Sequence, residues 1–215
     1  DWDLWIGPAK NNGYTPGLHA FSWRGYWEYG TGSLGDMGCH IMDVPIKALG
    51  IFDPFSIEAS VPRVPYVADF TPAPVYEESC PPSSYVTYKF RPSKINDSEV
   101  KMIWMDGGIR PSHPEIITDK DQIGDNGILM LGENGLIWSD YYGVNARLYI
   151  KGQKGAVEVG KISEINSVEF GHQKHWVDAI KAGFGSEEHM NLTSNFDFAG
   201  PCLLYTSPSP RDTDL

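Results

Sequence analysis

The sequence has little of several features that would restrict its function directly. It contains only three cysteines, Cys39, Cys80 and Cys202, which form no Cys-x-x-Cys motif and are too few for a disulfide framework. No run of 18 apolar residues is present, so we expect no membrane-spanning helix. Basic residues are outnumbered, with 17 Lys and Arg against 28 Asp and Glu and a net charge of -11. We therefore expect neither nucleic acid nor a membrane as a partner.

Cofactor and metal motifs are also missing. No G-x-G-x-x-G follows a predicted strand, and the GTGSLG run at 30–35 follows a glycine- and aromatic-rich entry loop instead. No H-x-x-x-H pattern supplies metal ligands. We expect no bound cofactor and no metal in this chain.

The residues that are present predict an α+β fold. Residues 1–32 are expected to form ordered loop, and residues 33–49 a helix with Ser33 as its N-cap and an interruption at Pro45. A second helix is expected at 171–183, closed by Gly183. Between them lie six strand-like runs, at 55–61, 83–90, 99–105, 127–132, 135–140 and 146–152. GENG (132–135) predicts a hairpin turn. Mostly sequential strands favour a largely antiparallel sheet.

The first predicted helix carries a stripe of four polar side chains: Asp36, His40, Asp43 and Lys47. Met37, Ile41, Val44, Ala48 and Leu49 are expected on the opposite side. The stripe has three interpretations. It could be a solvated polar face, a histidine acid/base oriented by a carboxylate, or part of a metal site completed from elsewhere.

Two further sets of residues could contact a substrate. Trp23 and Arg24 lie in an aromatic-rich run that suits a sugar, although the aromatic residues could equally pack the loop onto the sheet. His172 and His175 are expected on the second helix, where they could be functional or could flank a buried face together with Trp176 and Ile180.

Several segments together resemble the C-terminal domain of the Gfo/Idh/MocA family (glucose–fructose oxidoreductase and inositol dehydrogenase). They are, in order, DWDLWIGPA, WRGYWEYGTGSLGDMGCHIMD, NGILMLGENGLIWSDYYGVNARL, GHQKHWVDAIKAG and SNFDFAGP, which together cover nearly all of residues 1–201. The resemblance implies a large, mostly antiparallel open sheet with helices on one face. The other face usually forms an oligomer interface, which would make the chain a homodimer or higher homo-oligomer.

The resemblance also assigns roles. The family's D-x-x-x-H motif corresponds to Asp36 and His40, with the histidine as the acid/base for a sugar hydroxyl. Trp23, Arg24, Asp43 and His172 are the expected contacts to a small carbohydrate. Family members carry NAD or NADP in a separate Rossmann domain, of which this sequence shows no motif. Hydride transfer by this chain alone is therefore not expected.

Three functional hypotheses follow. The chain is the substrate-binding and oligomerisation domain, residues 1–201, of a bacterial sugar or cyclitol oxidoreductase, cytoplasmic or periplasmic. Alternatively, it is a stand-alone, NAD-independent glycoside hydrolase or lyase that uses His40 with Asp36 or Asp43, or a non-catalytic dimerisation module. Residues 202–215 are expected to be a disordered, non-native tail, because CLLYTSPSPRD (202–212) resembles a translated sequencing adapter.

Overall fold

The structure of the protein is a computed structural model, which describes residues 1–62, 78–117, 123–157 and 171–187. The chain divides into two compact units. The first comprises Asp1–Cys39 and Asp53–Pro111, and the second comprises His40–Phe52 and the described residues from Ser112 onward. The predicted domain limits and the nature of residues 202–215 stay predictions, because the tail lies outside the described residues.

The N-terminal segment of the first unit contains two short helices where the sequence predicted only loop. Helix α1 (Trp2–Ile6) begins at Asp1, whose carboxylate accepts a hydrogen bond from the Leu4 backbone N–H at 3.3 Å. It ends at Gly7, which has a positive φ of 56°. A short 3₁₀ helix, η1, follows at Ser22–Gly25. The prediction of loop was wrong over α1, because a five-residue helix is too short to show apolar periodicity.

The predicted helix at 33–49 is two helices, α2 (Gly32–Ile41) and α3 (Asp43–Leu49). The break falls before Pro45, not at it. Proline has no N–H to donate to the Ile41 carbonyl, so the ladder of α2 stops there, and Pro45 is accommodated in the first turn of α3. Ser33 is not the N-cap, because α2 begins at Gly32, whose φ of +68° favours glycine.

The polar stripe lies on α2 and α3 as predicted, with three members half-buried and Lys47 exposed. The expected apolar side is wrong: Met37, Ile41, Val44 and Leu49 are only half-buried and Ala48 is exposed. The buried residues are instead Gly32, Leu34 and Gly38 of α2, Pro45 and Ile46 of α3, and Met42 between the two helices. Residues 34, 38, 42 and 46 follow one another at i, i+4 and so mark the inward face.

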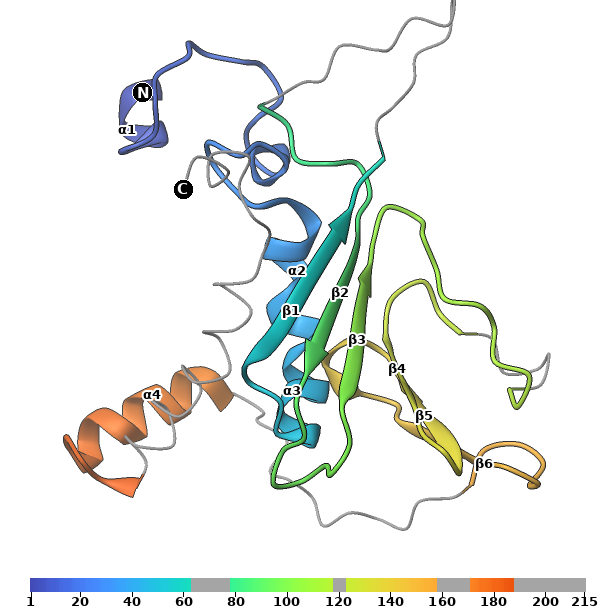
Figure 1. The fold of residues 1–215 in the computed structure, drawn as a ribbon. Helices are drawn as coiled ribbons and strands as arrows, with labels where there is room; N and C mark the ends of the chain where they lie inside the picture. Colours follow the sequence, from blue (N-terminus) through green and yellow to red (C-terminus); the bar gives the residue numbers. More distant parts are fainter. Residues whose placement is uncertain (63–77, 118–122, 158–170, 188–215) are drawn as a thin grey trace, which may run out of the picture. The chain divides into compact units, whose positions relative to one another are not determined.

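The first unit contains a three-stranded antiparallel sheet of order β1-β2-β3, formed by Pro54–Ser60, Tyr85–Phe90 and Val100–Met105 (Figure 1). Side chains alternate between its two faces. In β2, Val86, Tyr88 and Phe90 are at most 3% exposed. Opposite Val86 in the register stands Trp104, which is 6% exposed. This apolar face is the core of the first unit.

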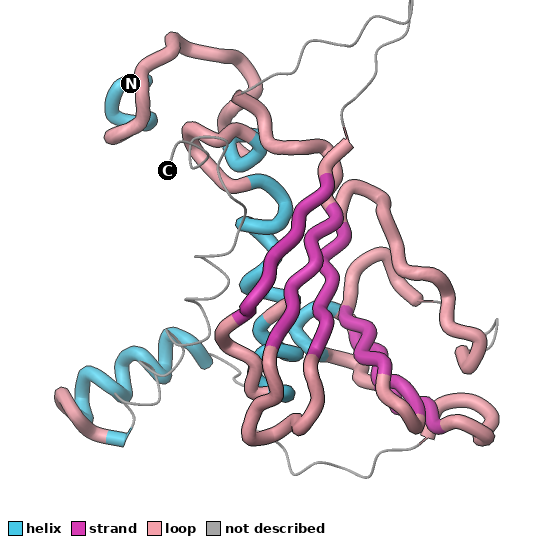
Figure 2. Tube along the Cα trace, viewed as in Figure 1, coloured by secondary structure: helices cyan, strands magenta, loops and turns pink. Residues whose placement is uncertain are grey.

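The second unit contains another antiparallel sheet, β4-β5-β6, formed by Ile128–Leu131, Gly135–Ser139 and Arg147–Ile150 (Figure 2). The predicted hairpin is confirmed: the Gly132 N–H donates to the Gly135 carbonyl at 2.9 Å. The core of this sheet is a cluster of four buried residues, Ile117, Leu136, Trp138 and Tyr149.

Helix α4 (Gly171–Ala182) ends as predicted at Gly183, which has a φ of +89°. Ala179 is buried, but Trp176 and Ile180 are each 62% exposed, so they do not flank a buried face. The α+β class and antiparallel pairing are confirmed. The described strands form two three-stranded sheets. The expectations of one large sheet, of helices along one of its faces and of self-association stay predictions. No described helix has the length and apolarity to span a membrane.

Candidate functional site

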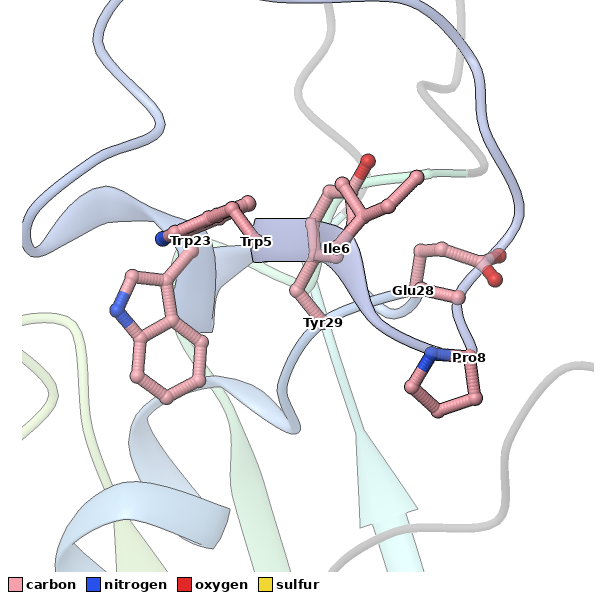
Figure 3. A pocket seen from close by; sticks show the side chains of 7 residues that line it. Trp5, Ile6, Pro8, Trp23, Glu28 and Tyr29 are labelled. Carbon is pink, nitrogen blue, oxygen red and sulfur yellow. The ribbon is translucent and has the colours of Figure 1, made fainter. Parts of the chain in front are cut away.

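The N-terminal segment of the first unit forms an open pocket of about 670 Å³. Its wall comes from α1, from η1 and from the turn that follows η1. Figure 3 shows Trp5 and Trp23 together on one side, Glu28 and Pro8 on the other, and Ile6 and Tyr29 between them. The volume lies within the range of small-molecule sites.

A group of aromatic rings in contact with one another holds the wall of the pocket in place. Trp2 and Trp5 are stacked with ring centroids 4.9 Å apart, and Tyr29 lies 5.7 Å from Trp5. Tyr14 meets Trp2 edge-on at 5.4 Å. One face of the Trp5 ring is therefore covered by Trp2. Such contacts stabilise by about 0.5–1.5 kcal/mol each beyond burial of area, so the rings form a fixed surface.

Glu28 fixes the opposite side of the pocket. Its Oε1 atom accepts a hydrogen bond from the Lys10 backbone N–H at 2.8 Å, which links the segment after α1 to the turn after η1. The carboxylate thereby adds negative charge and acceptor capacity to a lining that is otherwise aromatic and apolar.

Arg24 and Asp36, both singled out from the sequence, form an ion pair. Arg24 Nε lies 3.1 Å from Asp36 Oδ1, while its N–H makes no directed hydrogen bond, so the contact is chiefly electrostatic. Arg24 Nη1 donates to the Phe21 carbonyl at 3.0 Å. The guanidinium also lies 4.2 Å from the Phe21 ring centroid and 4.8 Å from that of Trp23. These contacts join the pocket residue Trp23 to the carboxylate of Asp36.

Two glycines allow close packing, Gly30 against the Arg24 backbone and Gly32 against the Cys80 side chain. A Cβ at Gly30 would lie 2.6 Å from the Arg24 Cα, and one at Gly32 would lie 2.9 Å from the Cys80 Cβ. The Cys80 backbone N–H donates to the Gly25 carbonyl at 2.8 Å. Burial among these groups raises the pKa of the Cys80 thiol to about 11. Gly35 faces the Thr31 side chain.

His40 lies one turn after Asp36 on α2 and is half-buried. Within the second unit its ring meets Tyr142 edge-on, with centroids 5.1 Å apart. Asp43 is the first residue of α3 and is half-buried. His172 is the second residue of α4, and its side chain is outside the described set.

The structure thus places Trp23 and Asp36 on either side of Arg24, and the substrate-binding role expected of these residues stays a prediction. Trp5, Glu28 and Tyr29 also line the pocket, although none of the three was among the expected substrate contacts. A signal for Trp5 was available in the W-x-x-W spacing of Trp2 and Trp5, which places two indoles on one side of a helix. No group of three His, Cys, Asp or Glu side chains in the described ranges could hold a metal ion.

The GTGSLG loop does not have the structural context of a dinucleotide-binding fingerprint. GTGSLG at 30–35 has the letters of G-x-G-x-x-G and leads into α2, but a hydrogen-bonded turn, and not a strand, precedes it. No cofactor chemistry is therefore assigned to this loop.

The described part of the chain has an α+β fold, and its first unit carries an aromatic pocket beside the Arg24–Asp36 ion pair. Residues 1–63, which carry the pocket residues and both members of the D-x-x-x-H motif, match the family model described as oxidoreductase family, C-terminal alpha/beta domain, of the Gfo/Idh/MocA proteins. The family resemblance is thereby confirmed over this segment. No curated protein matches the chain.

Proposed function

We propose that the chain supplies the substrate-binding surface of a sugar or cyclitol oxidoreductase. In this proposal Trp23, Arg24 and Asp36 contact the substrate, and His40 is the acid/base. The observation that carries the proposal is the Arg24–Asp36 ion pair of 3.1 Å, which lies beside a tryptophan of the pocket wall.

A sugar or cyclitol offers apolar C–H faces and a rim of hydroxyl groups. Aromatic faces such as those of Trp5 and Trp23 suit the C–H surface, and charged groups suit the hydroxyls. The Arg24 and Asp36 side chains are 27% and 36% exposed, so water or a ligand hydroxyl can reach both. Because each already holds the other in place, less side-chain entropy is lost when a ligand binds.

The role of His40 follows from its type and its place on α2. An imidazole is well suited to accept a proton from a substrate hydroxyl near neutral pH. Asp36 lies four residues earlier on the same helix, so the two side chains share a face. Asp43 and His172 stay secondary candidates for substrate contact.

The test measures binding of a panel of monosaccharides and cyclitols to the 215-residue chain by calorimetry, without and with NAD or NADP. Arg24→Ala is expected to weaken binding about tenfold or more, because a hydrogen bond to a charged group contributes about 1.5–3 kcal/mol. Trp23→Ala should weaken it as well. Each variant has a matched control elsewhere: Arg91→Ala, which removes a guanidinium 5.0 Å from the Phe55 ring, and Trp176→Ala, which removes an exposed indole of α4.

The proposal predicts saturable binding to the wild type and to both controls. Absence of binding to every member of the panel would contradict it. Equal losses for Arg24→Ala and Arg91→Ala would show that the arginine at the pocket has no special role.

A further inference from the structure

The second unit contains an aromatic contact to His40 that the functional proposal does not use. The Tyr142 ring meets the imidazole edge-on, at 5.1 Å and an interplanar angle of 73°. Tyr142 is itself 55% exposed and packs against Tyr141 at 4.8 Å. The Tyr142 side chain is therefore partly exposed to solvent although its ring contacts the His40 imidazole.

The backbone of Tyr142 is held in an unusual conformation. Its φ of 62° and ψ of 8° lie in the left-handed region, which costs free energy for a bulky residue. The turn around it is braced by three hydrogen bonds, one of which runs from the Gly143 backbone N–H to the Asp140 carbonyl at 3.2 Å. Asn145 Nδ2 donates to Asp140 Oδ2 at 2.6 Å, and the Asp140 backbone N–H donates to the Val144 carbonyl at 3.0 Å. The turn thus enforces a conformation that Tyr142 alone would not favour.

The same turn packs against the helix that follows His40. A Cβ at Gly143 would lie 3.2 Å from a methyl group of Val44, so the turn lies close against the first turn of α3. His40 and Val44 are four residues apart. The placement of Tyr142 against His40 is therefore set by backbone packing on one side and by the braced turn on the other.

We propose that Tyr142 is a positioning residue for His40. Its ring restricts rotation of the imidazole, so that the ring nitrogens keep one orientation, and the phenol hydroxyl is not required. The importance of this for catalysis rests on the acid/base role proposed for His40, but the positioning itself does not.

The test compares Tyr142→Phe with Tyr142→Gly in the full chain. Phenylalanine keeps the ring, whereas glycine removes it and also relaxes the left-handed backbone, so the turn should still fold. The first readout is the NMR chemical shift of the His40 ring protons, which senses a neighbouring aromatic ring directly. The second is the rate at which diethyl pyrocarbonate modifies His40, followed by mass spectrometry. Tyr141→Gly is the matched control, because it removes the adjacent ring.

Tyr142→Phe should leave both readouts at their wild-type values. Tyr142→Gly should displace the His40 ring resonances and raise the modification rate about 2- to 10-fold, the population change expected from losing an aromatic pair of about 0.5–1.5 kcal/mol. Unchanged resonances in Tyr142→Gly, or equal effects of Tyr141→Gly, would overturn the proposal. If these readouts behave as expected while no sugar binds, the positioning stands and the proposed function fails, so the two are distinguished.

Discussion

Substitution of Gly30 tests whether close backbone approach holds the Arg24–Asp36 pair together. Gly30 is outside the left-handed region, so alanine can adopt its backbone conformation and only the added Cβ matters. That Cβ would lie 2.6 Å from the Arg24 Cα and 2.8 Å from the Arg24 carbonyl oxygen. Ordinary carbon–carbon contact begins at about 3.5 Å, so the Arg24 backbone must move by about 1 Å. A shift of that size can lengthen the 3.1 Å ion pair beyond the range of a close contact.

Gly30→Ala should therefore lower the free energy of unfolding by about 1–3 kcal/mol, the usual cost of overpacking. In a chain of this size the melting temperature falls by about 2–4 °C per kcal/mol. Gly25→Ala is the control, because a Cβ at Gly25 meets no atom within 4 Å although it adjoins the same arginine. Urea unfolding followed by circular dichroism gives the comparison. Equal stability of the two variants would refute the reasoning, as would sugar binding that is weakened equally in both.

Two other predictions concern the interior of the first unit. The Asp106 carboxylate accepts hydrogen bonds from the Ser84 backbone N–H, the Ser84 hydroxyl and Trp104 Nε1. Asp106→Asn turns one acceptor into a donor and should therefore lower the free energy of unfolding by about 1–3 kcal/mol. An unchanged midpoint of urea unfolding would contradict this. Because burial raises the pKa of Cys80 from 9.0 to about 11, its neutral form is favoured in the folded state. Its contribution to stability is complete below pH 9 and is lost as pH rises through about 11. Cys80→Ala should flatten this loss, and iodoacetamide should label exposed Cys39 before Cys80.

The sequence predicted elements that depend on local pattern. All six strands and the turn at 132–135 were found where alternation and glycine placed them. The helix break was expected at Pro45 but lies three residues earlier, because proline affects the carbonyl one turn before it. Helix α1 could not be predicted, since five residues are too few to show a period.

The site was predictable only where the residues are near in sequence or carry a motif. Trp23 and Arg24 are adjacent, and Asp36 lies within the same quoted run. Trp5 and Tyr142 were not singled out, because what brings Trp5 to Tyr29 and Tyr142 to His40 is packing between segments far apart in the chain. The left-handed backbone of Tyr142 has no signature in the letters of the sequence.

The clustering of indoles near the N-terminus has an optical consequence. Four of the seven tryptophans, Trp2, Trp5, Trp23 and Trp27, lie in the first 27 residues. Two of them are stacked at 4.9 Å with an interplanar angle of 15°, close enough for their electronic transitions to couple. Intrinsic emission and near-ultraviolet dichroism will therefore report mainly on the pocket wall, and much less on the two sheets, which contain only Trp104 and Trp138.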